Sequence, residues 1–274
     1  MLDLLNYPFF TRALVSCLLI SIACGITGAY IVSKRIVFLA GSISHASFGG
    51  IGLGYYFGFN PILGAGVFAV ISALIAEKLS EKSKMRIDSA IGLLWSFGMA
   101  IGIIFIFITP GYAPDLTSYL FGSILTISSL DLLAVAAVAL IVAVSFFLFF
   151  KEILYTAFDS EYAKTQGVPV KGISYFVMAL SALTIVISIK AVGIILVISM
   201  LTIPQAAAGL ITKDFKRMIF LSIIFALAAS IAGLFMSAYI DIPSGAAIIF
   251  TAASMFIVTY CIKTIFSKKS EAKN

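Results

Sequence analysis

The chain has 274 residues, of which 62% are hydrophobic and only 11% are charged, and its mean hydropathy is +1.16. A soluble fold of this length has too little interior to bury so much apolar surface, so the composition excludes a soluble domain. We therefore expect an all-α fold, a polytopic integral membrane helical bundle with about eight to nine transmembrane helices in the lipid bilayer.

The apolar runs are too long and too continuous for barrel strands, and each approaches the ~20 residues that a helix needs to cross a bilayer. Nine runs are predicted to span the membrane: 11–32, 36–58, 62–80, 88–109, 128–150, 172–189, 191–211, 217–239 and 244–265. Around Lys190, one re-entrant or broken element could replace two full helices. Residues 1–265 would form a single transmembrane domain, and the polar, basic tail 266–274 is expected to be disordered.

The basic residues predict the orientation, since cytoplasmic loops of membrane proteins retain Lys and Arg. With the amino terminus outside the cell, nine spans leave only Arg12 and Lys190 of the 18 basic residues outside. This arrangement puts the carboxyl terminus in the cytoplasm. Asp115 and Asp131 then lie on the outer side, where they could form a mildly acidic mouth that favours cations, or merely cap helix ends.

The second span contains the single histidine of the chain, His45, within the glycine- and serine-rich run 38–54. An ionisable group at membrane depth is costly, and a neutral imidazole can bind a transition metal, so His45 is the first candidate for function. In a helix, Gly41 and Gly49 lie about one turn to either side of His45, which predicts open space beside the imidazole. The alternative is a histidine that donates a hydrogen bond to a neighbouring helix, with glycines present for packing.

Glycines at a spacing of four residues recur in two of the predicted spans. Gly50, Gly54 and Gly58 follow this spacing in the second span, and Gly98 and Gly102 follow it in the fourth. Such residues let helix backbones approach closely in lipid. Packing alone explains all five, so we assign them to the architecture of the bundle.

The longest polar stretch between spans is 151–170, on the predicted cytoplasmic side. Asp159 or Ser160 can cap a short helix within it. Phe158 and Tyr162 would lie on one face of that helix, a shape suited to docking into a groove of another protein. The alternative is an interfacial helix that only anchors the loop.

Several sequence motifs of enzymes do not occur in the chain. There is no phosphate-binding loop of the pattern G-x-x-x-x-G-K-[ST], no acid–base dyad, and no His/Cys cluster with the spacing of a closed metal site. We therefore expect a protein that is not itself an enzyme. No nucleic acid is expected among its partners. If ATP drives its function, a separate subunit hydrolyses the nucleotide.

Five segments resemble, in the right order, the membrane permease subunit of bacterial ABC-type importers for zinc, manganese and chelated iron. The segments are 34–50, 87–102, 118–125, 158–168 and 192–206. They are similar to the family's elements R-x-x-x-F-x-G-D-A-L-S-H-A-x-L-P-G, D-x-A-I-G-x-x-x-x-x-G-x-A-x-G, S-Y-L-F-G-D-I-L, F-D-x-E-x-A-x-x-x-G and V-G-x-L-L-x-x-x-x-L-x-I-P-A. Two aspartates of these elements are replaced here, by Gly41 and Ser123.

The resemblance implies a homodimeric permease in the bacterial inner membrane, with a translocation path along the dimer axis. Its partners would be two ATP-binding subunits on the cytoplasmic face and an extracytoplasmic metal-binding protein. Residues 157–167 would couple the permease to the ATPase. The expected contacts are Phe158, Asp159, Glu161, Tyr162, Ala163 and Gly167.

The expected cargo is a divalent metal, zinc or manganese first and iron next, and no cofactor is expected to be bound permanently. The ion would be coordinated transiently by His45, with help from Ser44, Met200 or Gln205. The two missing aspartates would suit a softer or chelated metal, or an ion that a binding protein has already selected. The alternatives are a permease for a metal chelate and a secondary metal carrier without an ATPase.

Overall fold

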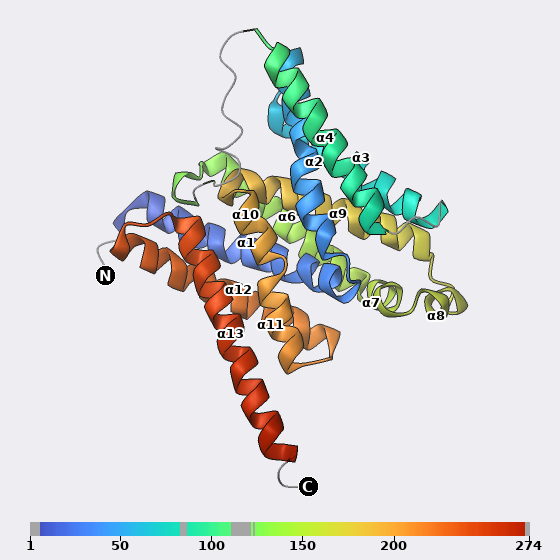
Figure 1. The fold of residues 1–274 in the computed structure, drawn as a ribbon, viewed down its shortest axis with the longest axis vertical. Coiled ribbons are helices and arrows are strands. Elements are labelled where there is room, and N and C mark those ends of the chain that lie inside the picture. Colours follow the sequence, from blue (N-terminus) through green and yellow to red (C-terminus); the bar gives the residue numbers. More distant parts are fainter. Residues whose placement is uncertain (1–5, 83–86, 111–121, 123, 272–274) are drawn as a thin grey trace.

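The computed structural model describes residues 6–82, 87–110, 122 and 124–271 (Figure 1). Its helices are α1 (Pro8–Ser33), α2 (Val37–Phe57), α3 (Pro61–Lys82), α4 (Ile87–Ile108), the 3-10 turn η2 (Ile124–Thr126), α6 (Ser129–Leu148), α7 (Phe150–Phe158), α8 (Ser160–Thr165), α9 (Val170–Val192), α10 (Ile194–Met200), α11 (Ile203–Ile211), α12 (Phe215–Ile240) and α13 (Ser244–Glu271). Among the described residues, nine helical segments are long and apolar enough to cross a membrane. The predicted polytopic helical bundle is confirmed.

The region around Lys190 contains two candidate spans, and the second of them is broken. Helix α9 continues through Lys190 and ends at Gly193, whose φ of +82° is a conformation that L side chains rarely adopt. The next span consists of α10 and α11, with Pro204 in the first turn of α11. Because proline lacks a backbone N–H, it suits the start of a new helix better than the interior of a continuous one.

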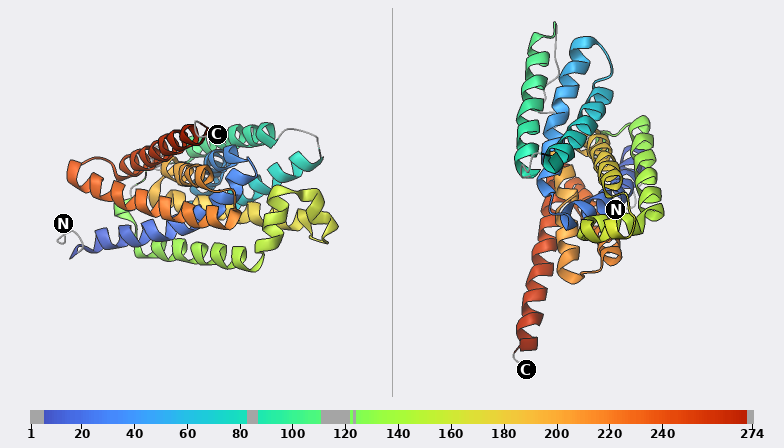
Figure 2. Two further views of the ribbon diagram at one scale, coloured as in Figure 1. Left: turned by 90° about the horizontal axis from the view of Figure 1, so that it is seen from below. Right: turned by 90° about the vertical axis from the view of Figure 1, so that its right-hand side faces the viewer.

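The helices divide into a buried core and an exposed periphery. Within the spanning windows, 72% of residues are buried in α1 and in α2, against 17% in α4 and 22% in α13. Helices α2, α3 and α4 project from one end of the molecule and α13 projects from the other (Figures 1 and 2). Phe107 and Phe147, 89% and 83% exposed, are apolar side chains suited to contact with hydrocarbon rather than water.

Close glycine contacts hold α2 against α3 and α4. A Cβ atom at Gly50 would lie 2.0 Å from the carbonyl oxygen of Gly64, and one at Gly54 would lie 2.6 Å from the Cα of Pro61. On α4, Cβ atoms at Gly98 and Gly102 would meet the backbone of α2 at 2.6 and 2.5 Å. At these four glycines the predicted role in helix packing agrees with the geometry.

Two sequence-based expectations differ from the structure. Gly58 does not pack against another helix: it is the C-cap of α2 with φ +74°, and a Cβ there would meet nothing within 4 Å. The row of packing glycines on α2 therefore stops at Gly54, because the helix ends before Gly58. The tail was expected to be disordered from residue 266, but α13 continues to Glu271, since no Gly or Pro interrupts 264–271.

Candidate functional site

The imidazole of His45 stacks on the indole of Trp95, which extends from α4. The ring centroids are 4.5 Å apart, and the two ring planes differ by 3°. Phe48, on the same helix as His45, stands 6.1 Å from the imidazole and is tilted by 41°. Both His45 and Trp95 are half-buried. The indole therefore covers one face of the imidazole and leaves the ring edge, which carries both nitrogens, uncovered by this contact.

The Nδ1 atom of His45 is buried and has no hydrogen-bond partner. The alternative in which this nitrogen donates to a neighbouring helix is therefore not seen. In the part of the chain that the structure describes, no group of three or more His, Cys, Asp or Glu side chains could hold a metal ion. An ion at His45 would complete its coordination with backbone, hydroxyl or water oxygens, a weaker arrangement than a closed four-ligand site.

The space beside His45 is open on one side only. A Cβ atom at Gly41 would meet just Ile198 Cδ1 of α10, at 3.8 Å, which is ordinary van der Waals contact. A Cβ atom at Gly49 would lie 2.7 Å from the ring of Phe68 on α3. The prediction of open space is thus confirmed at Gly41 and wrong at Gly49, because neighbouring helices pack onto that turn of α2.

Ser44 is fully buried next to His45 in the sequence. Its hydroxyl donates a 2.7 Å hydrogen bond to the carbonyl oxygen of Ala40, one turn earlier in α2. This bond uses the hydroxyl proton within the helix, while the oxygen keeps its capacity to accept.

Met200 and Gln205 lie on either side of the break between α10 and α11. The Gln205 amide donates hydrogen bonds to Cys24 O of α1 at 2.8 Å and to Met200 O at 3.0 Å. The Met200 sulfur accepts from the Ser230 hydroxyl of α12 at 3.9 Å. The bond to Met200 O satisfies a carbonyl that the helix break frees, because Pro204, four residues later, has no N–H to donate to it. No hydrogen bond or ring contact among the described residues brings either side chain to His45.

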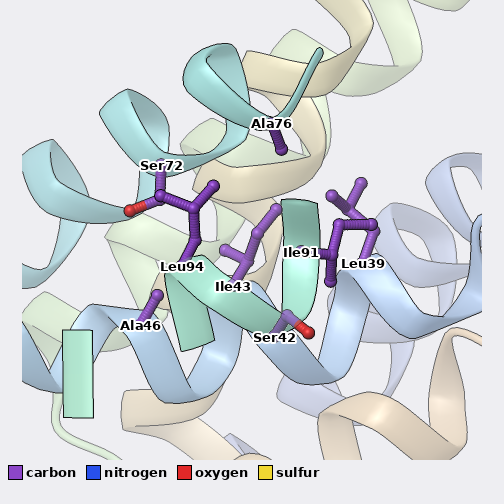
Figure 3. A pocket seen from close by; sticks show the side chains of 8 residues that line it. All are labelled: Leu39, Ser42, Ile43, Ala46, Ser72, Ala76, Ile91 and Leu94. Atoms are coloured by element: carbon purple, nitrogen blue, oxygen red, sulfur yellow. The ribbon is translucent and has the colours of Figure 1, made fainter. Parts of the chain in front are cut away.

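A small cavity lies between α2, α3 and α4 (Figure 3). It is lined by Leu39, Ser42, Ile43, Ala46, Ser72, Ala76, Ile91 and Leu94. Its volume of about 10 Å³ has room for about one water molecule. The Ser42 hydroxyl is buried without a hydrogen-bond partner. The size and the mainly apolar lining do not suit an ion path.

On the predicted outer side, Asp131 in the first turn of α6 forms an ion pair with Lys190 in the last turn of α9. Its carboxylate also accepts a 2.6 Å hydrogen bond from Ser128, the N-cap residue of α6. Asp131 thus lies at a helix start, where a negative charge is favoured, and a lysine compensates its charge. Asp115, the other predicted outer-mouth residue, lies outside the described residues.

The segment 151–170 folds into two short helices that meet at Asp159. The carboxylate of Asp159 accepts hydrogen bonds from the backbone N–H groups of Glu161 at 3.1 Å and Tyr162 at 2.9 Å. Asp159 rather than Ser160 is therefore the N-cap of α8, and the predicted short helix is confirmed.

The surface of α7 and α8 exposes two aromatic rings. Phe158 is 58% exposed and packs edge-on against Phe215 of α12, and Tyr162 is 47% exposed and packs against Tyr155. Because the chain turns at the cap between them, Phe158 and Tyr162 belong to different helices rather than to one helical face. Both rings are accessible to a partner. Ala163 is fully buried, and Gly167 follows α8 with φ +75°.

A polar network that no sequence motif signals joins the ends of three spans. Lys34, just after α1, donates a 2.6 Å hydrogen bond to Ser174 of α9 and lies 3.5 Å from Glu77 of α3. The Ser174 hydroxyl in turn donates to Glu77. Burial alone would lower the pKa of Lys34, but the neighbouring Tyr30 and Glu77 outweigh burial and raise the pKa above its ordinary value. The lysine therefore stays charged at neutral pH, next to the first turns of α9.

Comparisons with known proteins cover nearly the whole chain. The model of the ABC 3 transport family matches residues 6–263. An uncharacterized membrane protein of Synechocystis sp. is 40% identical over 96% of this chain and 94% of its own length. The manganese transport system membrane protein MntC of Halalkalibacterium halodurans is 35% identical over 94% of this chain and 88% of its own length. A solved structure of PsaBC from Streptococcus pneumoniae in complex with Fab is similar with a TM-score of 0.83, at 34% identity over 94% of both chains.

Proposed function

Because the chain belongs to the ABC 3 transport family, we propose that it carries Mn²⁺ into the cell as the membrane permease subunit of an ATP-driven metal importer. The observation that carries this proposal is the similarity, over 94% of the chain, to a relative named as a manganese transport membrane protein. The nine candidate spans are consistent with it. In this proposal the permease has no enzymatic chemistry of its own and holds the ion only in passing.

We assign the contact with the passing ion to His45. Its imidazole is half-buried. Because Nδ1 is itself buried, we assign the contact with the ion to the other ring nitrogen, Nε2. Mn²⁺ prefers oxygen ligands, and backbone carbonyls, hydroxyls or water can supply them around a single imidazole. Met200 and Gln205 are not included, because no hydrogen bond or ring contact among the described residues brings either side chain to His45, although the Gln205 side-chain oxygen is also buried without a hydrogen-bond partner.

The proposed partners are a cytoplasmic ATP-binding subunit, an extracytoplasmic metal-binding protein and a second copy of this chain. The proposed orientation has the amino terminus outside and the carboxyl terminus in the cytoplasm. The distribution of basic residues supports this orientation, since it leaves only Arg12 and Lys190 outside. The α7–α8 segment then lies on the cytoplasmic face, where an ATPase can reach Phe158 and Tyr162.

Uptake by the reconstituted importer tests the proposed function. Proteoliposomes that contain the permease, its ATPase and its binding protein are expected to accumulate Mn²⁺ only when ATP is supplied to the ATPase side. Radioactive Mn²⁺ measures the uptake, and unlabelled Zn²⁺ and Fe²⁺ added as competitors measure selectivity. Uptake that continues without the ATPase subunit would instead indicate a secondary carrier. Accumulation of radioactive Zn²⁺ without accumulation of radioactive Mn²⁺ would contradict the assignment to manganese, whereas inhibition by unlabelled Zn²⁺ alone would not, because Zn²⁺ binds most nitrogen and oxygen sites more tightly than Mn²⁺.

A metal chelate is the second candidate cargo, and one observation favours it. The aspartate of the family element is replaced by Gly41, and a Cβ there would meet only one atom within 4 Å. The position that lost a carboxylate thus leaves space rather than a new ligand. Elemental and mass analysis of the cognate binding protein distinguishes the two cargoes, since a chelate would be recovered together with its organic ligand.

Tyr162→Ala is expected to weaken binding of the ATPase subunit by about tenfold or more, the effect of losing one aromatic anchor at an interface. Tyr239→Ala is the matched control, because Tyr239 is 63% exposed but lies at the predicted outer end of α12. Recovery of the ATPase on affinity-tagged permease measures binding. Equal recovery with both variants would contradict the role of α7–α8 and, with it, the proposed cytoplasmic location of this segment.

A further inference from the structure

The imidazole of His45 is held in an unusual way for a metal-binding histidine. Such a histidine almost always donates its other ring N–H to a carboxylate, carbonyl or water, and this bond fixes the orientation of the ring. The Nδ1 atom of His45 is buried without a hydrogen-bond partner. The contact that can fix the ring is instead the parallel stack on Trp95, with centroids 4.5 Å apart and planes 3° from parallel.

A close approach of the two helix backbones places Trp95 over His45. Gly98 follows Trp95 by about one turn and lies on the same side of α4. A Cβ atom at Gly98 would lie 2.6 Å from the Cα and 2.7 Å from the carbonyl oxygen of Ala46, the residue after His45. Because Gly98 has no side chain, α4 touches α2 at this turn, and the indole one turn away reaches the imidazole.

We propose that Trp95 is a positioning residue for transport: its indole holds the imidazole plane of His45 so that the ring edge is presented to the passing ion. The proposal rests on the function proposed above, since it requires that the ion contacts His45. A metal ion binds an imidazole nitrogen along its lone pair, in the plane of the ring. A stack on the ring face therefore leaves the coordinating direction free, while it restricts rotation of the ring and reduces the entropy lost on binding.

The affinity of the importer for its ion tests this role. Trp95→Leu removes the flat ring but keeps an apolar side chain, and we expect it to raise the KM of Mn²⁺ uptake about three- to tenfold, with little change in the maximal rate. Trp95→Phe keeps a flat ring and should restore most of the wild-type KM. Phe97→Leu is the matched control on the same helix, since Phe97 is 59% exposed, and its KM should equal that of the wild type.

The emission of Trp95 provides a second measurement, because this is the single tryptophan of the chain. In the purified full-length permease, adding Mn²⁺ or Zn²⁺ is expected to change the tryptophan emission. The change should disappear in His45→Ala, since the ion then has no ligand next to the indole. The Trp95→Phe variant contains no tryptophan, so its emission gives the background signal.

The outcomes separate this inference from the proposed function. A Trp95→Leu importer with the wild-type KM, or a metal-induced emission change that persists in His45→Ala, would overturn the role of Trp95. Absence of Mn²⁺ uptake by the wild-type importer would overturn the proposed function instead. The emission experiment with Zn²⁺ would then still decide whether Trp95 and His45 respond to an ion together.

Discussion

His45→Ala is expected to abolish ATP-dependent uptake of Mn²⁺ while leaving the permease able to bind its ATPase subunit. His45 is the single histidine of the chain, and the described residues contain no group of three His, Cys, Asp or Glu that could replace it as a metal site. Loss of a coordinating side chain should reduce uptake by more than the roughly 10- to 100-fold that changing an outer-shell partner costs. Radioactive Mn²⁺ uptake by proteoliposomes measures the loss.

Two comparisons separate the loss of a ligand from the loss of structure. His45→Ala should retain the ATPase subunit on affinity-tagged permease, whereas Tyr162→Ala should lose the subunit although its imidazole is intact. If His45 contacts the ion and α8 contacts the ATPase, His45→Ala should fail in ion transport after normal assembly. Tyr162→Ala should fail earlier, in assembly with the ATPase subunit. Undiminished uptake by a correctly assembled His45→Ala importer would exclude His45 from the transport mechanism.

The features that could be predicted from the sequence are those that depend on a short stretch of chain. Bilayer thickness imposes a length on each apolar run, so the nine spans follow from local composition. The Asp159 cap is also local, because a carboxylate reaches only the next two or three backbone N–H groups. Gly58 shows the limit of this reasoning, since the choice between packing and helix termination depends on where the helix ends.

The features that could not be predicted are contacts between distant parts of the chain. Gln205 bonds to Cys24 across 181 positions, and Lys34 bonds to Ser174 across 140. A single sequence does not specify which helix faces meet, so neither these bonds nor the stack of Trp95 on His45 could be read from it. Gly41 and Gly49 illustrate the same point: they are equivalent by spacing, but neighbouring helices close only one of them.

Gly50→Ala is expected to lower the thermal stability of the permease markedly. A Cβ atom at position 50 would lie 2.0 Å from the carbonyl oxygen of Gly64 and 2.6 Å from the backbone nitrogen of Ala65. Both atoms belong to the backbone of α3, so no side-chain rotation can relieve the clash, and α2 must move away from α3. Overpacking of this kind typically costs about 1–3 kcal/mol. The midpoint of thermal unfolding in detergent measures the effect.

Gly66→Ala makes the same chemical change on α3 at a position where a Cβ atom would meet nothing within 4 Å. In a helix, alanine is favoured over glycine by roughly 0.5–1 kcal/mol, so this variant should be as stable as the wild type or more stable. A lower unfolding midpoint for Gly50→Ala together with an unchanged or higher midpoint for Gly66→Ala would locate the effect in the α2–α3 contact. Equal destabilisation by both substitutions would refute this explanation. Because α2 also carries His45, separating α2 from α3 displaces the candidate ion contact, and Gly50→Ala should lose Mn²⁺ uptake together with stability.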